Sequence, residues 1–185
     1  MIVTLAARAF QALFSIVVLG LSIALLKGWG PFYSSEEFHK NGSPPAIHGY
    51  GAFCGGAALL VSIVGIVSCF FEALQGIVVL ALDGIACLFV VAGGIAFAVK
   101  SGVGSCDVSN LEYFAKHLDI FQASPNKDYG QNEDKIVKKG LEDISARCRM
   151  VQADTAFLWF TFATFLLTVG LTFFARTGKR SGTIV

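Results

Sequence analysis

Three ionisable side chains interrupt long apolar stretches of the sequence, and they are the residues with the clearest potential for chemistry. Arg8 and Asp83 each lie about two helical turns into such a stretch, and Asp154 lies about one turn into another. A charge at the centre of a membrane helix costs about 2.5 to 3.5 kcal/mol on insertion scales, so each charge needs a partner or a function. Such charged residues in spans either form ion pairs inside the protein or belong to a pathway for protons or ions.

Arg8 and Asp83 are candidate partners in an ion pair. If both stretches enter the membrane from the same side, these residues lie at matching depths, which predicts an ion pair inside the protein joined by Gln11, one turn beyond Arg8. The alternative for Arg8 is to extend to the lipid headgroups, which its length permits.

Asp154 lies at the opposite end of its stretch, near Arg149 and Lys100, and we expect it to be a structural partner. The alternative is that Asp154 takes part in the transport of protons or ions. Asp83 and Asp154 at opposite ends, with no chain of polar residues between them, make a poor proton relay, so transport is disfavoured.

Catalytic and cofactor-binding patterns are not visible in the sequence. His39, His48 and His117 lack the paired spacing of a zinc site, and no nucleophile motif, phosphate loop or dinucleotide fingerprint occurs. The net charge is +1, without the concentrated basic face that nucleic acid requires. We therefore expect no enzyme, no cofactor, no metal and no nucleic-acid partner.

The apolar stretches themselves predict membrane helices. The 185 residues are 55% hydrophobic and 15% charged, which is too apolar for an ordinary soluble domain. A hydrocarbon core needs roughly 20 consecutive apolar residues in a helix, and four stretches reach that length. The predicted spans are residues 2–26, 48–71, 76–99 and 151–175. Buried helices of a soluble protein are the alternative, but such helices seldom run so long without a polar face.

Four spans place both termini on one side of the membrane. The expected domain covers residues 1–176, with extracellular loops at 27–47 and 100–150 and a cytosolic tail at 177–185. The connection around residues 72–75 is so short that the second and third spans must form an antiparallel hairpin. Basic residues in the tail favour a cytosolic C-terminus, although basic residues also flank the spans on the opposite side.

Two cysteines decide the orientation. Cys106 and Cys148 stand at the two ends of the third loop, where an oxidising exterior would let them form a disulfide. Closing this loop stabilises the fold by roughly 4 kcal/mol in the chain-entropy model. The alternative is two unrelated thiols in a cytosolic loop. Whether Asn41 is glycosylated or Cys69 is palmitoylated stays open.

The third loop is expected to be partly helical. Ser109 and Glu112 fit a capping box that starts a short amphipathic helix extending to Phe121. A second short helix is predicted by apolar residues between Val137 and Cys148, after a polar turn at residues 126–132. A linker without structure is the alternative.

Small residues mark the surfaces on which helices can approach closely. A G-x-x-x-G pair occurs in the second span, and more glycines punctuate the third. The candidate packing positions are Gly51, Gly55, Gly84, Gly93 and Gly94. We expect them to pack the bundle internally, with homo-oligomer contacts as the alternative. The fourth span is rich in aromatic residues, part of which should face lipid.

The sequence resembles a known family. The matching features are Arg8-x-x-Gln11, then IVVLGLS at residues 16–22, Asp83, Cys106, and CRxxQAxxAFLxF at residues 148–160. This pattern is similar to the fungal MARVEL-domain proteins of the non-classical export type, and its last segment is the most specific. The resemblance implies a four-helix MARVEL bundle in the plasma membrane, with cytosolic termini and a part in organising lateral domains such as eisosomes.

The expected fold is therefore an all-α, four-helix transmembrane bundle with a disulfide-clasped, partly helical extracellular loop. Our leading functional hypothesis is a non-enzymatic organiser of plasma-membrane domains, with a role in trafficking or lipid-responsive signalling. Its partners would be membrane lipids, including sphingolipid or sterol, other membrane proteins, or further copies of the chain. The second hypothesis is an accessory subunit of a larger membrane enzyme or transporter.

Overall fold

The computed structural model describes residues 2–27, 44–70, 77–102, 104–122 and 133–181, and these residues form helices and short connections. The helices are α1 (Ile2–Lys27), α2 (Ala46–Ser68), α3 (Ile77–Ser101), α4 (Leu111–Lys116), α5 (Leu118–Phe121) and α6 (Glu133–Ser181). Four of them, α1, α2, α3 and α6, are long and apolar enough to cross a membrane. The predicted all-α fold with four apolar helices is confirmed.

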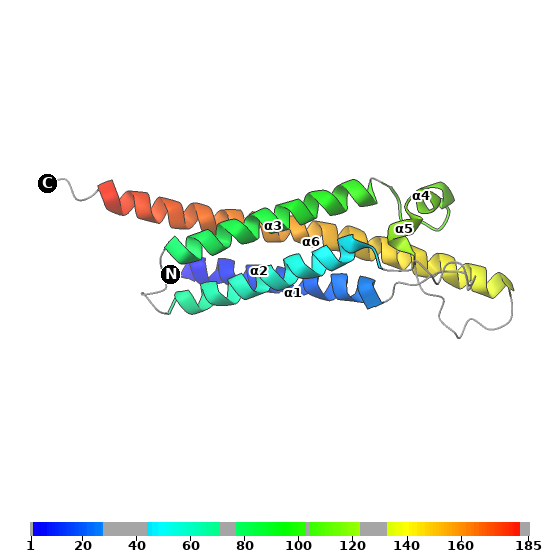
Figure 1. Ribbon diagram of the computed structural model, residues 1–185, viewed down its shortest axis with the longest axis horizontal. Coiled ribbons are helices and arrows are strands. Elements are labelled where there is room, and N and C mark those ends of the chain that lie inside the picture. Colours follow the sequence, from blue (N-terminus) through cyan, green and yellow to red (C-terminus); the bar gives the residue numbers. More distant parts are fainter. Residues whose placement is uncertain (1, 28–43, 71–76, 103, 123–132, 182–185) are drawn as a thin grey trace.

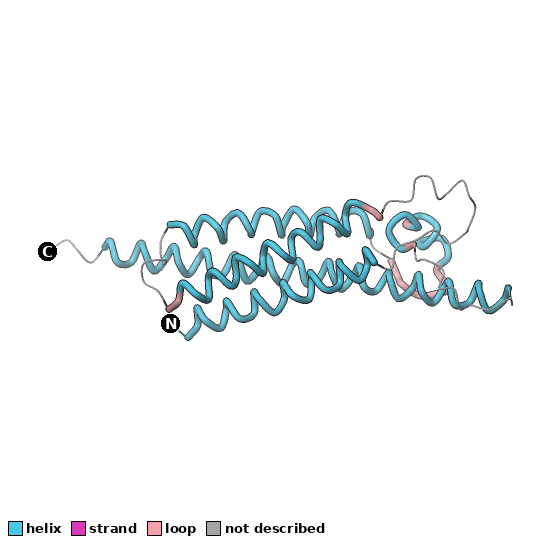
Figure 2. Tube along the Cα trace, turned by 60° about the horizontal axis from the view of Figure 1, so that its bottom comes forward, coloured by secondary structure: helices cyan, strands magenta, loops and turns pink. Residues whose placement is uncertain are grey.

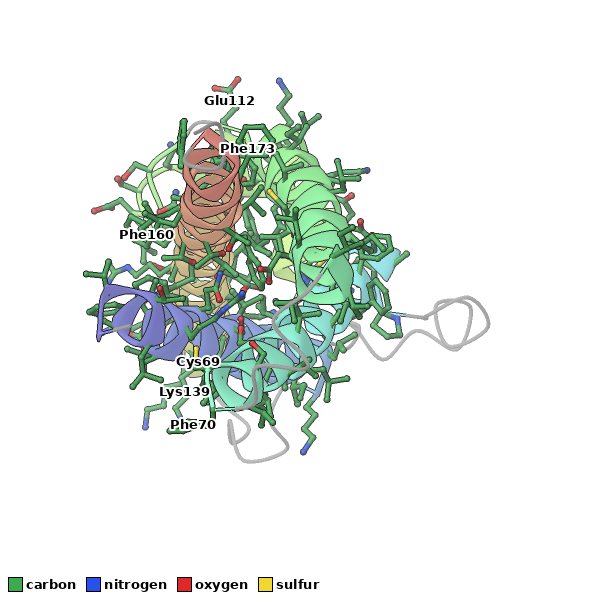
Figure 3. All side chains as sticks on the ribbon, turned by 90° about the vertical axis from the view of Figure 1, so that its left-hand side faces the viewer. Cys69, Phe70, Glu112, Lys139, Phe160 and Phe173 are labelled. Atoms are coloured by element: carbon green, nitrogen blue, oxygen red, sulfur yellow. A yellow bond between two sulfur atoms is a disulfide. The ribbon has the colours of Figure 1, made fainter. Side chains whose placement is uncertain are left out.

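The four long helices form an antiparallel bundle, drawn lengthwise in Figure 1. Helices α1 and α3 each pack against both α2 and α6, so α1 and α3 face each other across the centre of the bundle. Figure 3 views this arrangement from one end, with α1 in blue, α2 in cyan, α3 in green and α6 in orange and red. Both termini lie at one end of the bundle, and α4 and α5 lie at the other.

The bundle turns its polar side chains inward. Within residues 3–26, 46–68, 77–99 and 153–174, every side chain classed as exposed is apolar. The fully or almost fully buried polar side chains of the spans include Arg8, Gln11, Ser15, Ser22, His48, Ser62, Asp83, Asp154, Thr161 and Thr168. This is the reverse of a soluble protein, and it suits a chain whose surroundings cannot form hydrogen bonds.

Glycines bring α1 and α2 into close contact. A Cβ atom at Gly55 would lie 2.6 Å from the backbone nitrogen of Leu19, and one at Gly51 would collide with the hydroxyl of Ser22. Gly93 and Gly94 of α3 similarly face side chains of α2 and α6. At Gly84 the expected internal packing is not found, because no atom lies within 4 Å of a Cβ added there, and its use in contacts between copies stays a prediction.

The end of the bundle away from the termini carries a small helical cap, which we define as residues 104–122. Helix α3 ends where Gly102 adopts a left-handed conformation with φ of 62°, a conformation that glycine accepts without strain. The cap then folds back, and the hydroxyl of Tyr113 donates a 2.7 Å hydrogen bond to the carbonyl of Ser101. Figure 2 shows the cap lying alongside α6, whose first turns extend beyond it.

The predicted disulfide is present between Cys106 and Cys148, whose Cα atoms lie 5.7 Å apart. It joins the start of the cap to α6, and Ser145 strengthens the junction by donating a 2.6 Å hydrogen bond to the carbonyl of Cys106. The third loop is therefore attached to the bundle covalently and by hydrogen bonds.

Mass-tagging of free thiols can test whether the disulfide forms. The chain has five cysteines, of which Cys54, Cys69 and Cys87 are free. We expect a denatured, unreduced sample to take up three maleimide tags of high mass and a reduced sample to take up five, as read on a gel. The Cys106→Ser variant should take up four without reduction, because Cys148 then loses its partner. Five tags on the unreduced native sequence would show that the bond does not form.

Two details of the third loop differ from the prediction. The helix expected between Ser109 and Phe121 is broken at His117 into α4 and α5. The capping box is absent as well, because Asn110 is the N-cap, without a side-chain hydrogen bond, and Ser109 binds Asp107 instead. Hydrogen bonds from the backbone and hydroxyl of Ser109 lower the pKa of Asp107 and stabilise this local turn.

The predicted separate helix at Val137–Cys148 is also wrong, because it continues without a break into the fourth span. Helix α6 has 49 residues and is about 74 Å long at 1.5 Å per residue. Residues 145–152 (SARCRMVQ) contain no glycine or proline that would end a helix. The helix therefore projects well past the bundle at the cap end, as Figure 1 shows.

Several predicted features lie outside the described residues. They are most of the first loop with Asn41, the turn at residues 72–75, the polar turn at residues 126–132 and the last residues of the tail. The described helices begin or end within about six residues of the predicted span limits, except at the start of α6.

Candidate functional site: the polar interior of the bundle

The first polar cluster lies near the end of the bundle that holds the termini, and we call it the inner network (Arg8, Gln11, Asp83 and Thr168). Arg8 of α1 and Asp83 of α3 form a bidentate ion pair, with Nη1 to Oδ1 and Nη2 to Oδ2 both at 2.6 Å. The two side chains are 3% and 0% exposed. Arg8 therefore does not extend to the headgroups. The pair crosses the bundle between helices that otherwise face each other diagonally.

Gln11 extends the inner network to α6. Its side-chain oxygen accepts a 3.0 Å hydrogen bond from Nη1 of Arg8, and its Nε2 donates to Oγ1 of Thr168 at 2.9 Å. Helix α2 contributes Gly65, where an added Cβ atom would lie 2.5 Å from Nε of Arg8. All four spans thus meet around Arg8 and Gln11. Arg8 passes so close to Gly65 that any side chain at position 65 would collide with it.

The second polar cluster lies under the cap, and we call it the cap junction (Ser22, His48, Arg147 and Asp154). Asp154 is fully buried, and its Oδ2 accepts a 2.6 Å hydrogen bond from the hydroxyl of Ser22. The expected neighbours of Asp154 are wrong: Lys100 pairs with Asp119 of the cap at 3.9 Å, and Arg149 is exposed. No cation lies within ion-pair distance of Asp154 among the described residues.

His48 and Arg147 each reach a backbone carbonyl across the cap junction. The Nε2 atom of His48 lies 3.2 Å from the carbonyl oxygen of Ile120 in α5, and Nη2 of Arg147 donates a 2.8 Å hydrogen bond to the carbonyl of Leu25 at the end of α1. Three buried atoms in this cluster have no partner: His48 Nδ1, Arg147 Nε and Asp154 Oδ1. The cap junction is thus less completely paired than the inner network.

These clusters hold the bundle together, and their geometry does not resemble a catalytic site. Among the described residues, no group of three or more histidine, cysteine or acidic side chains is placed to hold a metal ion. Cys54 is buried and donates to a backbone carbonyl, so it is not positioned as a nucleophile. The side chains of both clusters are used for contacts between helices.

The sequence predicted that Arg8, Gln11 and Asp83 lie together. It did not predict that four other residues belong to the polar clusters or contact them, namely Ser22, His48, Gly65 and Arg147. A signal existed for two of them. The buried side of α2 consists of His48, Gly51, Cys54, Gly55, Ala58, Ser62, Gly65 and Ser68, at helical spacing. Extending the G-x-x-x-G pattern in both directions along that stripe would have included His48 and Gly65.

The two buried acids should respond differently to the same substitution. Asp83→Asn removes a charge that Arg8 needs, which leaves a buried, unpaired cation. Asp154→Asn keeps an oxygen that can accept the hydrogen bond from Ser22. We expect the first variant to lower the unfolding midpoint in detergent clearly more than the second. Equal losses would mean that Asp154 has a charged partner in the folded protein.

The fold and its interior define a class of protein, namely an α-helical integral membrane protein with four spans and an internally paired polar core. A family comparison goes further, because the MARVEL family, described as a membrane-associating domain, matches residues 2–171. The chain therefore belongs to the MARVEL family. Comparisons with curated proteins and with solved structures gave no match.

Proposed function

We propose that this chain is a non-enzymatic organiser of lateral domains in the plasma membrane, of the eisosome type, with a role in trafficking or lipid-responsive signalling. The observation that supports it is the division between interior and surface. Polar side chains of the spans turn inward, where they bind one another or backbone carbonyls, and only apolar side chains are exposed on the outer surface of the spans. Such a protein acts in the membrane plane through the lipids and helices that its surface favours.

Bulky aromatic side chains shape part of this outer surface. Phe160 and Phe173 are 53% and 56% exposed and project from α6 in Figure 3, and Phe174 is 73% exposed. We propose that this rigid aromatic surface favours flat sterol rings or ordered sphingolipid chains over disordered chains. We infer that lipid preference, rather than a bound substrate, is the property on which the function rests.

The proposed orientation places both termini in the cytosol and the cap outside the cell. The disulfide between Cys106 and Cys148 supports this orientation, because such bonds persist in oxidising surroundings. Both termini emerge from the opposite end of the bundle, and the tail carries Arg176, Lys179 and Arg180 in keeping with a cytosolic location.

An accessory subunit of a larger membrane protein is the second candidate. Apolar side chains outside the bilayer favour it, because Leu111 and Leu118 of the cap are 58% and 43% exposed and Val137 of α6 is 53% exposed. These residues offer a surface to which another protein could dock.

One experiment separates the two functions. A fluorescent fusion is imaged in cells, and the same protein is purified in mild detergent with its lipids and neighbours quantified by mass spectrometry. Patches in the plasma membrane and enrichment of sphingolipid or sterol support the organiser. A uniform distribution and one large partner at fixed stoichiometry support the accessory subunit.

A matched pair of variants sharpens this test. Replacing Phe160, Phe173 and Phe174 with leucine keeps the surface apolar but removes its rings, so the patches should weaken while the protein stays folded. The control replaces three exposed isoleucines, Ile85, Ile95 and Ile16, with valine, and should leave the patches intact. If both sets behave like the native sequence, the aromatic surface has no part in the distribution.

A further inference from the structure

We propose that His48 is a latch that holds the cap on the bundle at neutral pH and releases it when the side of the membrane that bears the cap becomes acidic. His48 is fully buried in the first turn of α2. Its buried side chain reaches α5 through a 3.2 Å contact with the carbonyl of Ile120.

The contact with Ile120 determines where the proton of the neutral ring sits. A carbonyl oxygen only accepts hydrogen bonds, so Nε2 of His48 must carry the proton and donate it. Nδ1 is then a bare nitrogen, and it is buried without a hydrogen-bond partner. A second proton would have to bind at Nδ1, where no described group accepts it.

The charges around His48 make that second proton more costly. On α6, Arg147 is close enough to act on His48 electrostatically, and it is itself a cation. Asp143 interacts with Arg147, and Asp154 binds Ser22. Lys100 of α3 and Asp119 of α5 are both more than 60% exposed and face each other. Among the described residues, no acidic side chain pairs with His48, so protonation creates an uncompensated buried charge.

Release of the cap relieves this cost, because His48 then becomes accessible to water. The docked cap buries Ile120 and Phe121, which are 2% and 0% exposed, and undocking must expose them. The disulfide between Cys106 and Cys148 keeps the chain tethered throughout. The cap can therefore open and close without loss of its position, which makes the change reversible.

The coupling between proton binding and cap opening gives the expected change in the open fraction. An exposed histidine has a pKa of about 6.5, so below that pH the open state takes up a proton more readily than the docked state, in which the ring is buried and its Nδ1 has no partner. Docking is thus favoured above about pH 6.5 and is weakened as the pH falls. Between pH 7.5 and pH 5.0 the open fraction rises by up to about 30-fold.

Hydrogen exchange of the full chain in lipid nanodiscs, where both faces meet the buffer, tests the latch. Exchange is measured at pH 7.5 and 5.0 on peptides covering α4 and α5, after division by the intrinsic chemical rates. We expect exchange in the native sequence to accelerate by about 10- to 30-fold at the lower pH. In His48→Gln, whose amide can donate to Ile120 but cannot gain a charge, the acceleration should fall below about 3-fold.

The second histidine of the cap supplies the control. His117 packs against the ring of Tyr113 at 4.9 Å and is only partly buried, so His117→Gln should keep the response of the native sequence. Equal protection of the native cap at both pH values would overturn the proposal, as would a full response in His48→Gln. If His48→Gln does not fold, the comparison of the native sequence with His117→Gln is still informative. A pH response that is lost in His117→Gln would show that His117, and not His48, controls the cap, and would overturn the proposal.

Discussion

Replacing Asp83 with leucine is expected to destabilise the folded bundle by about 3 to 5 kcal/mol, the cost of breaking a buried ion pair by removing one partner. Arg8 would keep its position at 2% exposure, with Gln11 as its remaining partner. The loss should appear as a lower unfolding midpoint in a detergent titration and as retention of the variant in the endoplasmic reticulum.

The double variant Arg8→Leu with Asp83→Leu is the control for this prediction. It removes both charges, and buried ion pairs can often be replaced by apolar side chains at little cost. We expect it to recover most of the lost stability and to reach the cell surface. Normal expression of Asp83→Leu alone would contradict the assignment of the ion pair as a structural element.

Replacing Gly55 with alanine is expected to have the second largest effect, on the order of 1 to 3 kcal/mol by analogy with overpacked cores. The added Cβ atom would lie 2.6 Å from the nitrogen and 2.9 Å from the Cα atom of Leu19. These are backbone atoms, so no side-chain rotation relieves the collision, and α1 and α2 must move apart. The separation also displaces the inner network, because Arg8 lies on the same helix.

Two other glycines provide matched controls in the same assay. At Gly56, the next residue in α2, the nearest atom to an added Cβ is 4.0 Å away, and at Gly84 no atom lies within 4 Å. Alanine at either position should be neutral or slightly stabilising, because alanine favours the helix over glycine. Equal destabilisation by all three substitutions would point to helix flexibility, rather than close packing, as the reason for Gly55.

The four spans, their antiparallel order and the disulfide could be predicted from the sequence because each depends on a local pattern. The length of an apolar stretch determines whether it crosses a bilayer. A short connection determines that its two neighbouring helices pair, and the number of spans determines that the termini share a side. The ion pair of Arg8 and Asp83 followed from the same reasoning, because depth along a span can be counted in residues.

Other features depend on how the helices rotate and approach, which no local pattern determines. Asp154 binds Ser22 rather than Lys100 because the packing of α1 against α6 places that hydroxyl at its level. Gly65 matters only because Arg8 crosses it on the way to Asp83. The position of the cap against the side of α6 depends on the disulfide and on the hydrogen bond of Ser145, which join segments 42 and 39 residues apart.

The sequence by itself thus determined that this protein is embedded in a bilayer, how many times it crosses and that Arg8 and Asp83 pair, because lipid penalises every unsatisfied polar group. The tertiary structure alone decided which helix faces touch. That choice placed His48 beneath Ile120 and left its Nδ1 without a partner, since residue spacing gives the depth of a side chain along its helix but not the direction in which the helix turns it.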